Sequence, residues 1–156
     1  HNDMNISCWT WNFFNDDILW MILPYIRLYL MTHQKRFLDQ SIWLWDYLQE
    51  RGWDNELGGG YWWSMDNDAK SGLSNNPAMC LGVYLYEATG EQKYLDQAKK
   101  IFDWVYEILR NENGSVDENI NIYGTAYPRR ANGFTAYNQG TFIEGAAGLY
   151  RITREK

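Results

Sequence analysis

Residues 85 to 105, LYEATGEQKYLDQAKKIFDWV, decide the fold, because the chain contains a close copy of the same stretch. Residues 28 to 48, LYLMTHQKRFLDQSIWLWDYL, align with it without gaps at an offset of 57 residues. A third copy begins with LYRIT at residues 149 to 153, which lies 64 residues further along the chain. A period of this size is typical of an array of repeated supersecondary units.

Each repeated unit has the pattern of a helical hairpin. Apolar side chains recur at intervals of three and four residues, as one face of a helix requires; in the second copy they are Tyr94, Ala98, Ile101, Val105 and Ile108. The glycine in TGEQ, Gly90, supplies a helix stop between the two helices of a unit. The sequence predicts helices over 16–32, 35–51, 75–89, 91–110 and 139–154. The β-prone pieces GYWW and NIYGTAY are expected to form at most small hairpins in the loops.

The predicted fold is therefore all-α, in one domain over 1–156 with repeat units at approximately 16–57, 73–114 and 137–156. Repeated hairpins stack into an open solenoid or close into a ring, and equivalent positions then lie at the same end of the array. The repeat offsets carry Asp16-Asp17 onto Leu73-Ser74 and then onto Tyr137-Asn138. We expect these polar helix starts to converge on one face, bordered by the LGGGYWW stretch.

Composition excludes several classes of function. A net charge of -6 and a pI near 4.8 argue against a partner that is nucleic acid or an anionic membrane surface. The longest apolar run, ILWMILPYIRLYL, is too short for a membrane span, contains Pro24 and carries Arg27. Two cysteines and two histidines provide neither a disulfide framework nor a conventional zinc site. The chain begins with histidine and has no signal-peptide pattern, which indicates a processed protein or a piece of one.

The aromatic content points toward carbohydrate. Nine Trp and twelve Tyr are more than a core of this size needs. Trp and Tyr combine a flat apolar face with a polar tip, so they stack on a ligand and also form hydrogen bonds. Sugar rings, with an apolar face and a rim of hydroxyls, suit that combination. A Trp-rich core accounts for most of the individual tryptophans, and the excess suggests a sugar-binding surface.

Asp16 and Asp17 have a structural and a functional interpretation. Asn15 before them is a good N-cap, and first-turn aspartates complement the helix dipole, so local spacing alone favours a structural role. Adjacent helical side chains point about 100° apart, which allows carboxyl groups to flank a small group at about 5–5.5 Å, as in retaining glycosidases. Two such close charges also raise one pKa. An aspartate-rich magnesium motif does not fit, because its later aspartate is absent and Trp20 stands in that region.

Five segments, in order along nearly the whole chain, resemble glycoside hydrolase family 76, the endo-α-1,6-mannanases. NDDILWM resembles the catalytic aspartate pair of the family with the tryptophan that follows. GWDNELGGGYWW is similar to its tryptophan-aspartate segment and glycine-tryptophan loop, and KSGLSN to its lysine-to-asparagine stretch. The repeat at 85–105 and the segment YNQGTFIEGAAGLY complete the set. Single pieces also occur in other α/α toroids, whereas five in the same order are specific.

The resemblance implies an (α/α)6 barrel that cleaves α-1,6-linked mannose within the chain and retains the anomeric configuration, without metal or cofactor. By the family pattern, Asp16 is the nucleophile and Asp17 the general acid/base. The residues implied to line the sugar subsites are Trp20, the Gly58-Gly59-Gly60 loop, Trp62, Trp63, Lys70, Asn75, Tyr137 and Asn138. The implied partner is α-mannan or a related glycan, and the implied location is extracellular or at the cell surface.

The chain departs from the family in length, because a six-hairpin barrel needs about twice as many residues. Only two full hairpins and part of a third are expected here, and a partial barrel would expose helix faces that favour self-association. Fungal cell-wall members are thought to act as transglycosidases, so transfer to an acceptor is an alternative to hydrolysis. A non-catalytic glycan-binding module is the alternative from another class. Epimerases of similar shape usually rely on histidines, which are nearly absent here.

Overall fold

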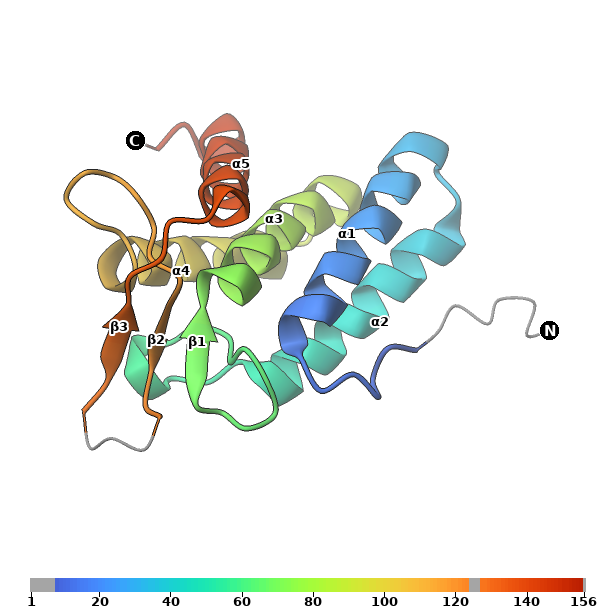
Figure 1. The fold of residues 1–156 in the computed structure, drawn as a ribbon. Helices are drawn as coiled ribbons and strands as arrows, with labels where there is room; N and C mark the ends of the chain where they lie inside the picture. Colours follow the sequence, from blue (N-terminus) through green and yellow to red (C-terminus); the bar gives the residue numbers. More distant parts are fainter. Residues whose placement is uncertain (1–7, 124–126, 156) are drawn as a thin grey trace.

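A computed structural model describes residues 8–123 and 127–155, and helices make up most of this part of the chain (Figure 1). The helices are α1 (Asn15–Thr32), α2 (Lys35–Gly52), α3 (Gly72–Thr89), α4 (Gln92–Ile108) and α5 (Ala136–Thr153), with a short 3-10 turn at Glu56–Gly58. All five predicted helices are present. Two of them, α3 and α5, begin three residues earlier than predicted, because their N-cap residues are Ser71 and Thr135.

The sequence repeat is visible in how the helices begin and end. Helices α1, α3 and α5 each have 18 residues, and their starts keep the offsets of 57 and 64 residues. Each ends in a threonine whose hydroxyl donates to the carbonyl of a leucine four residues earlier, in the pairs Thr32–Leu28, Thr89–Leu85 and Thr153–Leu149. A residue in the left-handed conformation follows each threonine, namely His33, Gly90 and Arg154. The LYxxT pattern is therefore a repeated helix terminator.

The helices form two rows. In the inner row, α3 lies between α1 and α5, whereas α2 packs on α1 and α4 packs on α3 as an outer row (Figure 1). The apolar core fills the space between the helices, with its fully buried members including Ile18, Ile22, Leu44, Met79 and Tyr94. This arrangement buries the two sides of α3 and leaves one side of α1 and one side of α5 without a neighbouring inner helix.

Both free sides expose apolar residues. Helix α1 exposes Leu28 and Met31, with 79% of Met31 accessible to solvent, and α5 exposes Ile143 and Tyr150. Among the described residues, no helix is both long and apolar enough to span a membrane. The two exposed apolar sides are thus surfaces of a helical layer that is open at both edges.

A small antiparallel sheet joins the loops at one end of the inner helices. Its strands β1 (Ala69–Ser71), β2 (Asn119–Asn121) and β3 (Arg129–Ala131) are hydrogen-bonded in that order (Figure 1). Single bridges from Lys70 to Trp62 and from Ser64 to Phe14 continue the pairing to the residue before α1. The sequence predicted at most small hairpins in the loops, whereas the structure links the loops into one ribbon that ends at Phe14, two residues before Asp16.

Candidate active site

One short segment, residues 61–63, holds the starts of two inner helices. The side-chain amide of Asn15 donates to the carbonyl of Trp62 at 2.8 Å, and its backbone N–H donates to the carbonyl of Trp63 at 2.8 Å. On α3, Asn75 accepts from the Tyr61 backbone N–H at 2.8 Å and donates to its carbonyl at 3.1 Å. The starts of α1 and α3 are therefore fixed relative to each other through buried amides.

The prediction that Asn15 caps α1 is wrong. The N-cap residue is Phe14, which forms no side-chain capping bond, and Asn15 is the first residue of the helix with its amide directed at Trp62. The long-range bond replaces the local one because Trp62 presents a carbonyl that would otherwise be buried without a partner. The first turn of α1 is left to Asp16 and Asp17.

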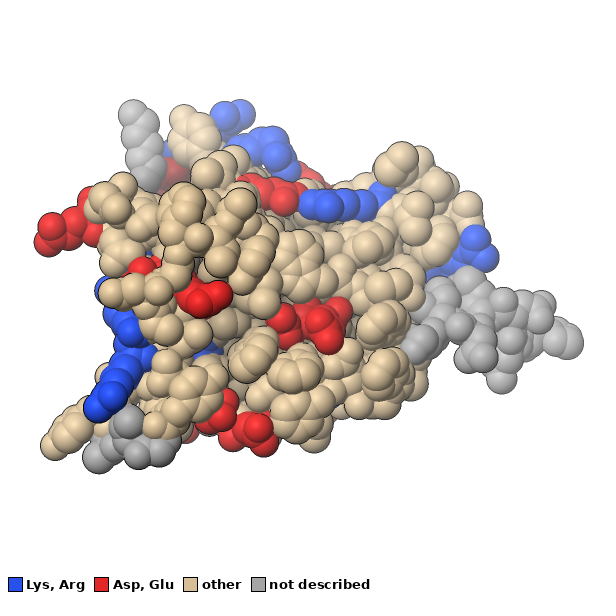
Figure 2. Space-filling model, in the orientation of Figure 1, with Lys and Arg blue, Asp and Glu red and all other residues tan. Residues whose placement is uncertain are grey.

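Asp16 is recessed at the centre of the site. Only 6% of the residue is exposed, and its Oδ1 is buried without a hydrogen-bond partner among the described residues. Burial raises the pKa of Asp16 to about 6; hydrogen bonding from the Trp63 side chain opposes the rise and the charge of Asp17 adds to it. Figure 2 shows an acidic patch over the start of α1, surrounded by uncharged surface.

Asp17, in contrast, is exposed to solvent. Its Oδ2 accepts a hydrogen bond from the side-chain amide of Asn12 at 3.1 Å. The oxygen of the same amide accepts from the backbone N–H of Phe14 at 2.8 Å. Two consecutive carboxyl groups therefore differ in environment, one recessed and one open to a ligand.

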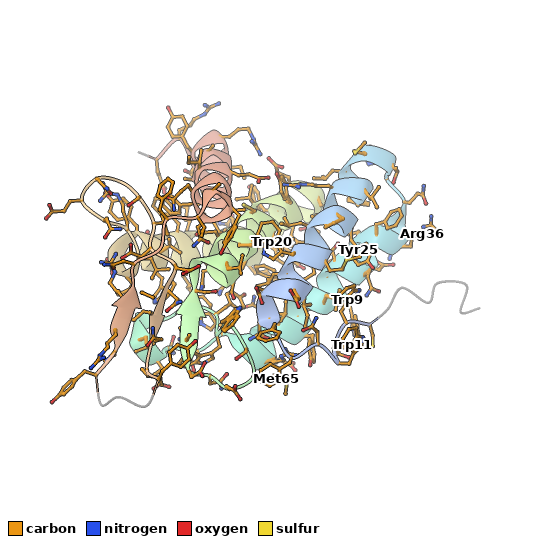
Figure 3. All side chains as sticks on the ribbon, in the orientation of Figure 1. Trp9, Trp11, Trp20, Tyr25, Arg36 and Met65 are labelled. Carbon is orange, nitrogen blue, oxygen red and sulfur yellow. The ribbon has the colours of Figure 1, made fainter. Side chains whose placement is uncertain are left out.

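Aromatic side chains surround the pair. Trp63 is half-buried and packs on Phe14 with ring centroids 5.0 Å apart. Trp20 is also half-buried and lies about one turn after the aspartates on α1, so it shares their side of the helix. Figure 3 shows Trp11 and Met65 on the loops beside the start of α1, and they are 69% and 57% exposed. Trp20 and Trp63 thus keep accessible surface next to the carboxyl groups.

Trp62 and Lys70 lie beneath the glycine loop. Trp62 is 2% exposed and its Nε1 donates to Asp54 Oδ2 at 2.6 Å. Lys70 is fully buried, forms a 2.5 Å ion pair with Asp54 Oδ1, and lies 4.4 Å from the centroid of the Trp62 ring. Its ammonium also donates to the carbonyls of Glu56 and Gly59 at 2.6 and 2.8 Å. Both side chains hold the glycine loop from beneath.

Asp54 anchors this buried group. Burial raises the pKa of Asp54, but hydrogen bonds from Lys70 and Trp62 outweigh that effect and hold it below its usual value. Burial lowers the pKa of Lys70, and the Asp54 carboxylate opposes that shift. Sequence reasoning did not single out Asp54, although the Trp-Asp pair in GWDNELGGG was the available signal.

The glycine loop crosses directly over Trp104 of α4. A Cβ added to Gly60 would lie 2.9 Å from the Trp104 ring, and the φ of Gly60 is +89°. Gly59 is also buried, with φ +123°, and Trp104 Nε1 donates to the carbonyl of Leu57 at 3.0 Å. Residue 60 must be glycine for the loop to approach Trp104 this closely, and the positive φ favours glycine at residue 59.

The third inner helix presents one exposed and one buried residue. Tyr137 is 41% exposed, and its hydroxyl donates to Glu118 Oε1 at 3.4 Å. Asn138 is fully buried, and a Cβ added to Gly72 would lie 3.0 Å from its Oδ1. The Asn76 amide donates to the carbonyl of Asn138 at 3.1 Å, so Asn138 lies at the contact between α3 and α5. Glu118 is a further carboxylate beside this surface that sequence reasoning missed.

The profile of glycosyl hydrolase family 76 matches residues 1–156, the whole chain. The chain belongs to glycosyl hydrolase family 76. Most glycoside hydrolases use a pair of Asp or Glu residues, and Asp16 and Asp17 are such a pair at the start of α1.

Solved family 76 structures share this fold. The GH76A α-1,6-mannanase from Salegentibacter sp. HEL1_6 is 32% identical, with a TM-score of 0.87 over 92% of this chain and 43% of that enzyme. An inactive variant of the same enzyme, with two consecutive aspartates replaced by asparagine, was solved in complex with α-1,6-mannotriose. The five helices are therefore part of an α/α toroid.

Among curated family relatives, mannan endo-1,6-alpha-mannosidase DCW1 of Saccharomyces cerevisiae is 30% identical over 110 residues. The match covers 65% of this chain and 24% of the yeast protein. The chain thus spans about a quarter of the yeast relative and less than half of the solved bacterial enzyme.

The candidate site is built from carboxyl, amide and aromatic groups. Within residues 8–123 and 127–155, no group of three or more His, Cys, Asp or Glu side chains is placed to hold a metal ion. An apolar hollow of about 380 Å³ lies between α4 and α5, lined in part by Phe102, Leu149 and Tyr150. The α5 residues that line this hollow lie in the C-terminal half of the helix, whereas the aspartates lie at the start of α1, so the hollow is separate from them.

Proposed function

We propose that this chain carries the catalytic pair of a retaining glycosidase that cleaves α-1,6-linked mannan. The observation that carries the proposal is the pair Asp16-Asp17 at the open start of an inner helix, with one carboxyl recessed and the other exposed. The similarity to an α-1,6-mannanase whose inactive variant lacks two consecutive aspartates supports this proposal.

In this mechanism Asp17 acts as the acid and then as the base. Asp17 protonates the departing glycosidic oxygen while a carboxylate oxygen of Asp16 attacks the anomeric carbon, which forms a glycosyl-enzyme ester. Asp17, now ionised, takes a proton from the water that attacks the same carbon and releases Asp16. The exposure of Asp17 suits exchange of the leaving group and water.

The reverse assignment is a second candidate, and one observation favours it. The pKa of Asp16 is raised to about 6, and a raised pKa is typical of the acid in such pairs. Azide separates the two assignments. Without the acid/base carboxyl, azide attacks the glycosyl-enzyme and yields a glycosyl azide of retained configuration. Without the nucleophile, azide attacks the substrate directly and yields the inverted product.

We assign the predicted sugar-lining residues to two groups. Trp20, Trp63 and Tyr137 keep accessible surface near the carboxyl groups and are proposed to contact the glycan. The buried residues are proposed to position that surface instead; they are Gly59, Gly60, Trp62, Lys70, Asn75 and Asn138. Exchange of a contact residue should alter KM, whereas exchange of a positioning residue should also lower stability.

The deciding experiment is product analysis by mass spectrometry after incubation of linear α-1,6-mannan in oxygen-18 water. The parent chain is compared with Asp16→Asn and Asp17→Asn. Labelled oligosaccharides from the parent alone support hydrolysis by both aspartates. Unlabelled, lengthened chains would identify transfer to an acceptor. Mannan binding without any product would contradict catalysis and leave a glycan-binding module.

Self-association is a further part of the proposal. The exposed apolar residues on the free sides of α1 and α5, Leu28, Met31, Ile143 and Tyr150, favour contact between copies of this chain. Sedimentation velocity should show oligomers that dissociate in the double variant Met31→Ser and Ile143→Ser. A monomeric parent chain at high concentration would refute this part alone.

A further inference from the structure

The loop before α1, residues 8–14, is fixed by the end of the outer helix α2. The guanidinium of Arg51 donates to the carbonyls of Asn12 and Phe13 at 2.7 and 3.1 Å. The Tyr47 hydroxyl donates to the carbonyl of Thr10 at 3.1 Å, and Arg51 lies over the Tyr47 ring at 5.5 Å. Because α2 packs on α1, the outer helix sets where this loop meets the aspartates.

Asn12 is the residue through which the loop reaches the site. It is 8% exposed, so its amide is removed from competing water. Its Oδ1 accepts from the Phe14 backbone N–H, which is a donor only, and this bond fixes which end of the amide is oxygen. The donor end, Nδ2, must then face Asp17 Oδ2. The orientation of the Asn12 amide is thus determined by the backbone.

This orientation constrains the Asp17 carboxyl in two ways. The hydrogen bond holds the carboxyl in one rotamer, which reduces the freedom that catalysis would otherwise have to remove. The carbonyl oxygen of a protonated carboxyl is a better acceptor than its hydroxyl oxygen, so the bond to Oδ2 favours a proton on the other oxygen, Oδ1. The bond therefore selects which oxygen carries the proton.

We propose that Asn12 is a positioning residue for the general acid, which orients the Asp17 carboxyl and directs its proton to Oδ1. The inference rests on the proposed function, in which Asp17 protonates the leaving group. Arg51 and Tyr47 support Asn12 by holding the loop. A purely structural Asn12, which only closes the turn with Phe14, would have no influence on proton transfer.

Two variants separate the proposed effect of Asn12 on the Asp17 proton from its role in closing the turn with Phe14. Asn12→Ser retains an oxygen that accepts from Phe14 but is too short to reach Asp17. Asn12→Asp retains the size and the acceptor, and replaces the donor by a second acceptor. Asp39→Asn is the control, because it changes an exposed aspartate on α2 that pairs with Lys35 and makes no contact with the described loop residues 8–14.

The measurement is kcat/KM on two substrates that differ in their need for an acid. α-1,6-Mannotetraose has a sugar alkoxide leaving group that requires a proton, whereas the 2,4-dinitrophenyl glycoside of α-1,6-mannobiose releases a phenolate that does not. Both Asn12 variants should lose about tenfold or more on the tetraose and less than about twofold on the dinitrophenyl glycoside. Asp39→Asn should leave the ratio of the two values unchanged.

The outcomes separate this inference from the proposed function. Equal losses on both substrates, or no loss on either, in a chain that cleaves the tetraose would overturn the role of Asn12 alone. A parent chain that cleaves neither substrate would overturn the proposed function and the inference with it. Thermal melting of each variant confirms that the compared proteins are folded.

Discussion

The starts of α1 and α3 occupy the same place in successive repeats and use their polar residues differently. Helix α3 begins after Ser71, whose side chain accepts from the Ser74 backbone N–H at 3.2 Å. Helix α1 begins after Phe14 without a side-chain cap, and positions equivalent to Leu73 and Ser74 hold Asp16 and Asp17. One helix start is capped in the ordinary way, whereas the other carries the proposed chemistry.

The buried polar groups at the start of α1 are less well satisfied by hydrogen bonds than those at the start of α3. Asn75 on α3 has its amide oxygen and nitrogen bonded to Tyr61 and Ser71. On α1, Asp16 is buried with an unpartnered oxygen and a raised pKa. Local sequence–structure rules are most often broken at functional sites. The start of α3 therefore serves as an internal reference against which the start of α1 can be tested.

The largest expected effect is on catalysis. Asp16→Asn and Asp17→Asn should each lower kcat/KM for α-1,6-mannan by roughly a thousandfold or more, because each removes a nucleophile or a proton donor. Reducing-sugar release measures this. The matched control is Asp39→Asn, which changes an exposed aspartate paired with Lys35 on α2 and should retain activity. Equal activity of all variants would mean that the α1 start is structural, as the α3 start is.

The next effect is on stability at the reference helix. Asn75→Ala should lower the free energy of unfolding by about 2–4 kcal/mol, because it leaves the buried polar groups of Tyr61 and Ser71 without partners. Urea unfolding followed by circular dichroism measures the change. A loss below about 1 kcal/mol would show that the segment 61–63 is held mainly by other contacts.

At the start of α1, replacing the buried polar residue Asp16 should raise the free energy of unfolding rather than lower it. The pKa of Asp16 is raised from 3.8 to about 6, so the folded state favours the protonated acid. Below pH 3.8 Asp16 is mostly protonated in the folded and the unfolded states, so its ionisation does not lower the free energy of unfolding of the parent chain. That free energy of unfolding falls as pH rises through about 6, because the folded protein must then ionise a buried carboxyl. Asp16→Asn removes this loss, and should gain about 2–3 kcal/mol more at pH 8 than at pH 4. The same gain at both pH values would refute the raised pKa.

The smallest effect concerns the cap itself. Ser71→Ala should cost about 1 kcal/mol, because the N–H of Ser74 loses its acceptor. Thr135→Ala at α5 is the comparison, since Thr135 makes no side-chain capping bond there, and it should cost less than about half as much. Similar losses at both sites would indicate that packing, rather than capping, sets the stability of these helix starts.

The sequence alone determined the periodic part of this protein. The helix pattern and the LYxxT terminators are local, since each depends on residues within about four positions of one another, and the repeat shows the same pattern again further along the chain. The equivalence of the helix starts at 57 and 64 residues also follows from the repeat, and it placed Asp16-Asp17 at the end of the array where Tyr137 is found.

Only the tertiary structure decided which side chains of the site face solvent. Lys70 and Trp62 are buried and both bond to Asp54, and Asn75 is buried and bonds to Tyr61. The ribbon of three-residue strands and the contact of Asn12 with Asp17 likewise depend on loop positions that have no period. A polar residue at a helix start has the same local sequence pattern whether its partner is a distant backbone group or a sugar. The tertiary structure alone determines which of the two it contacts.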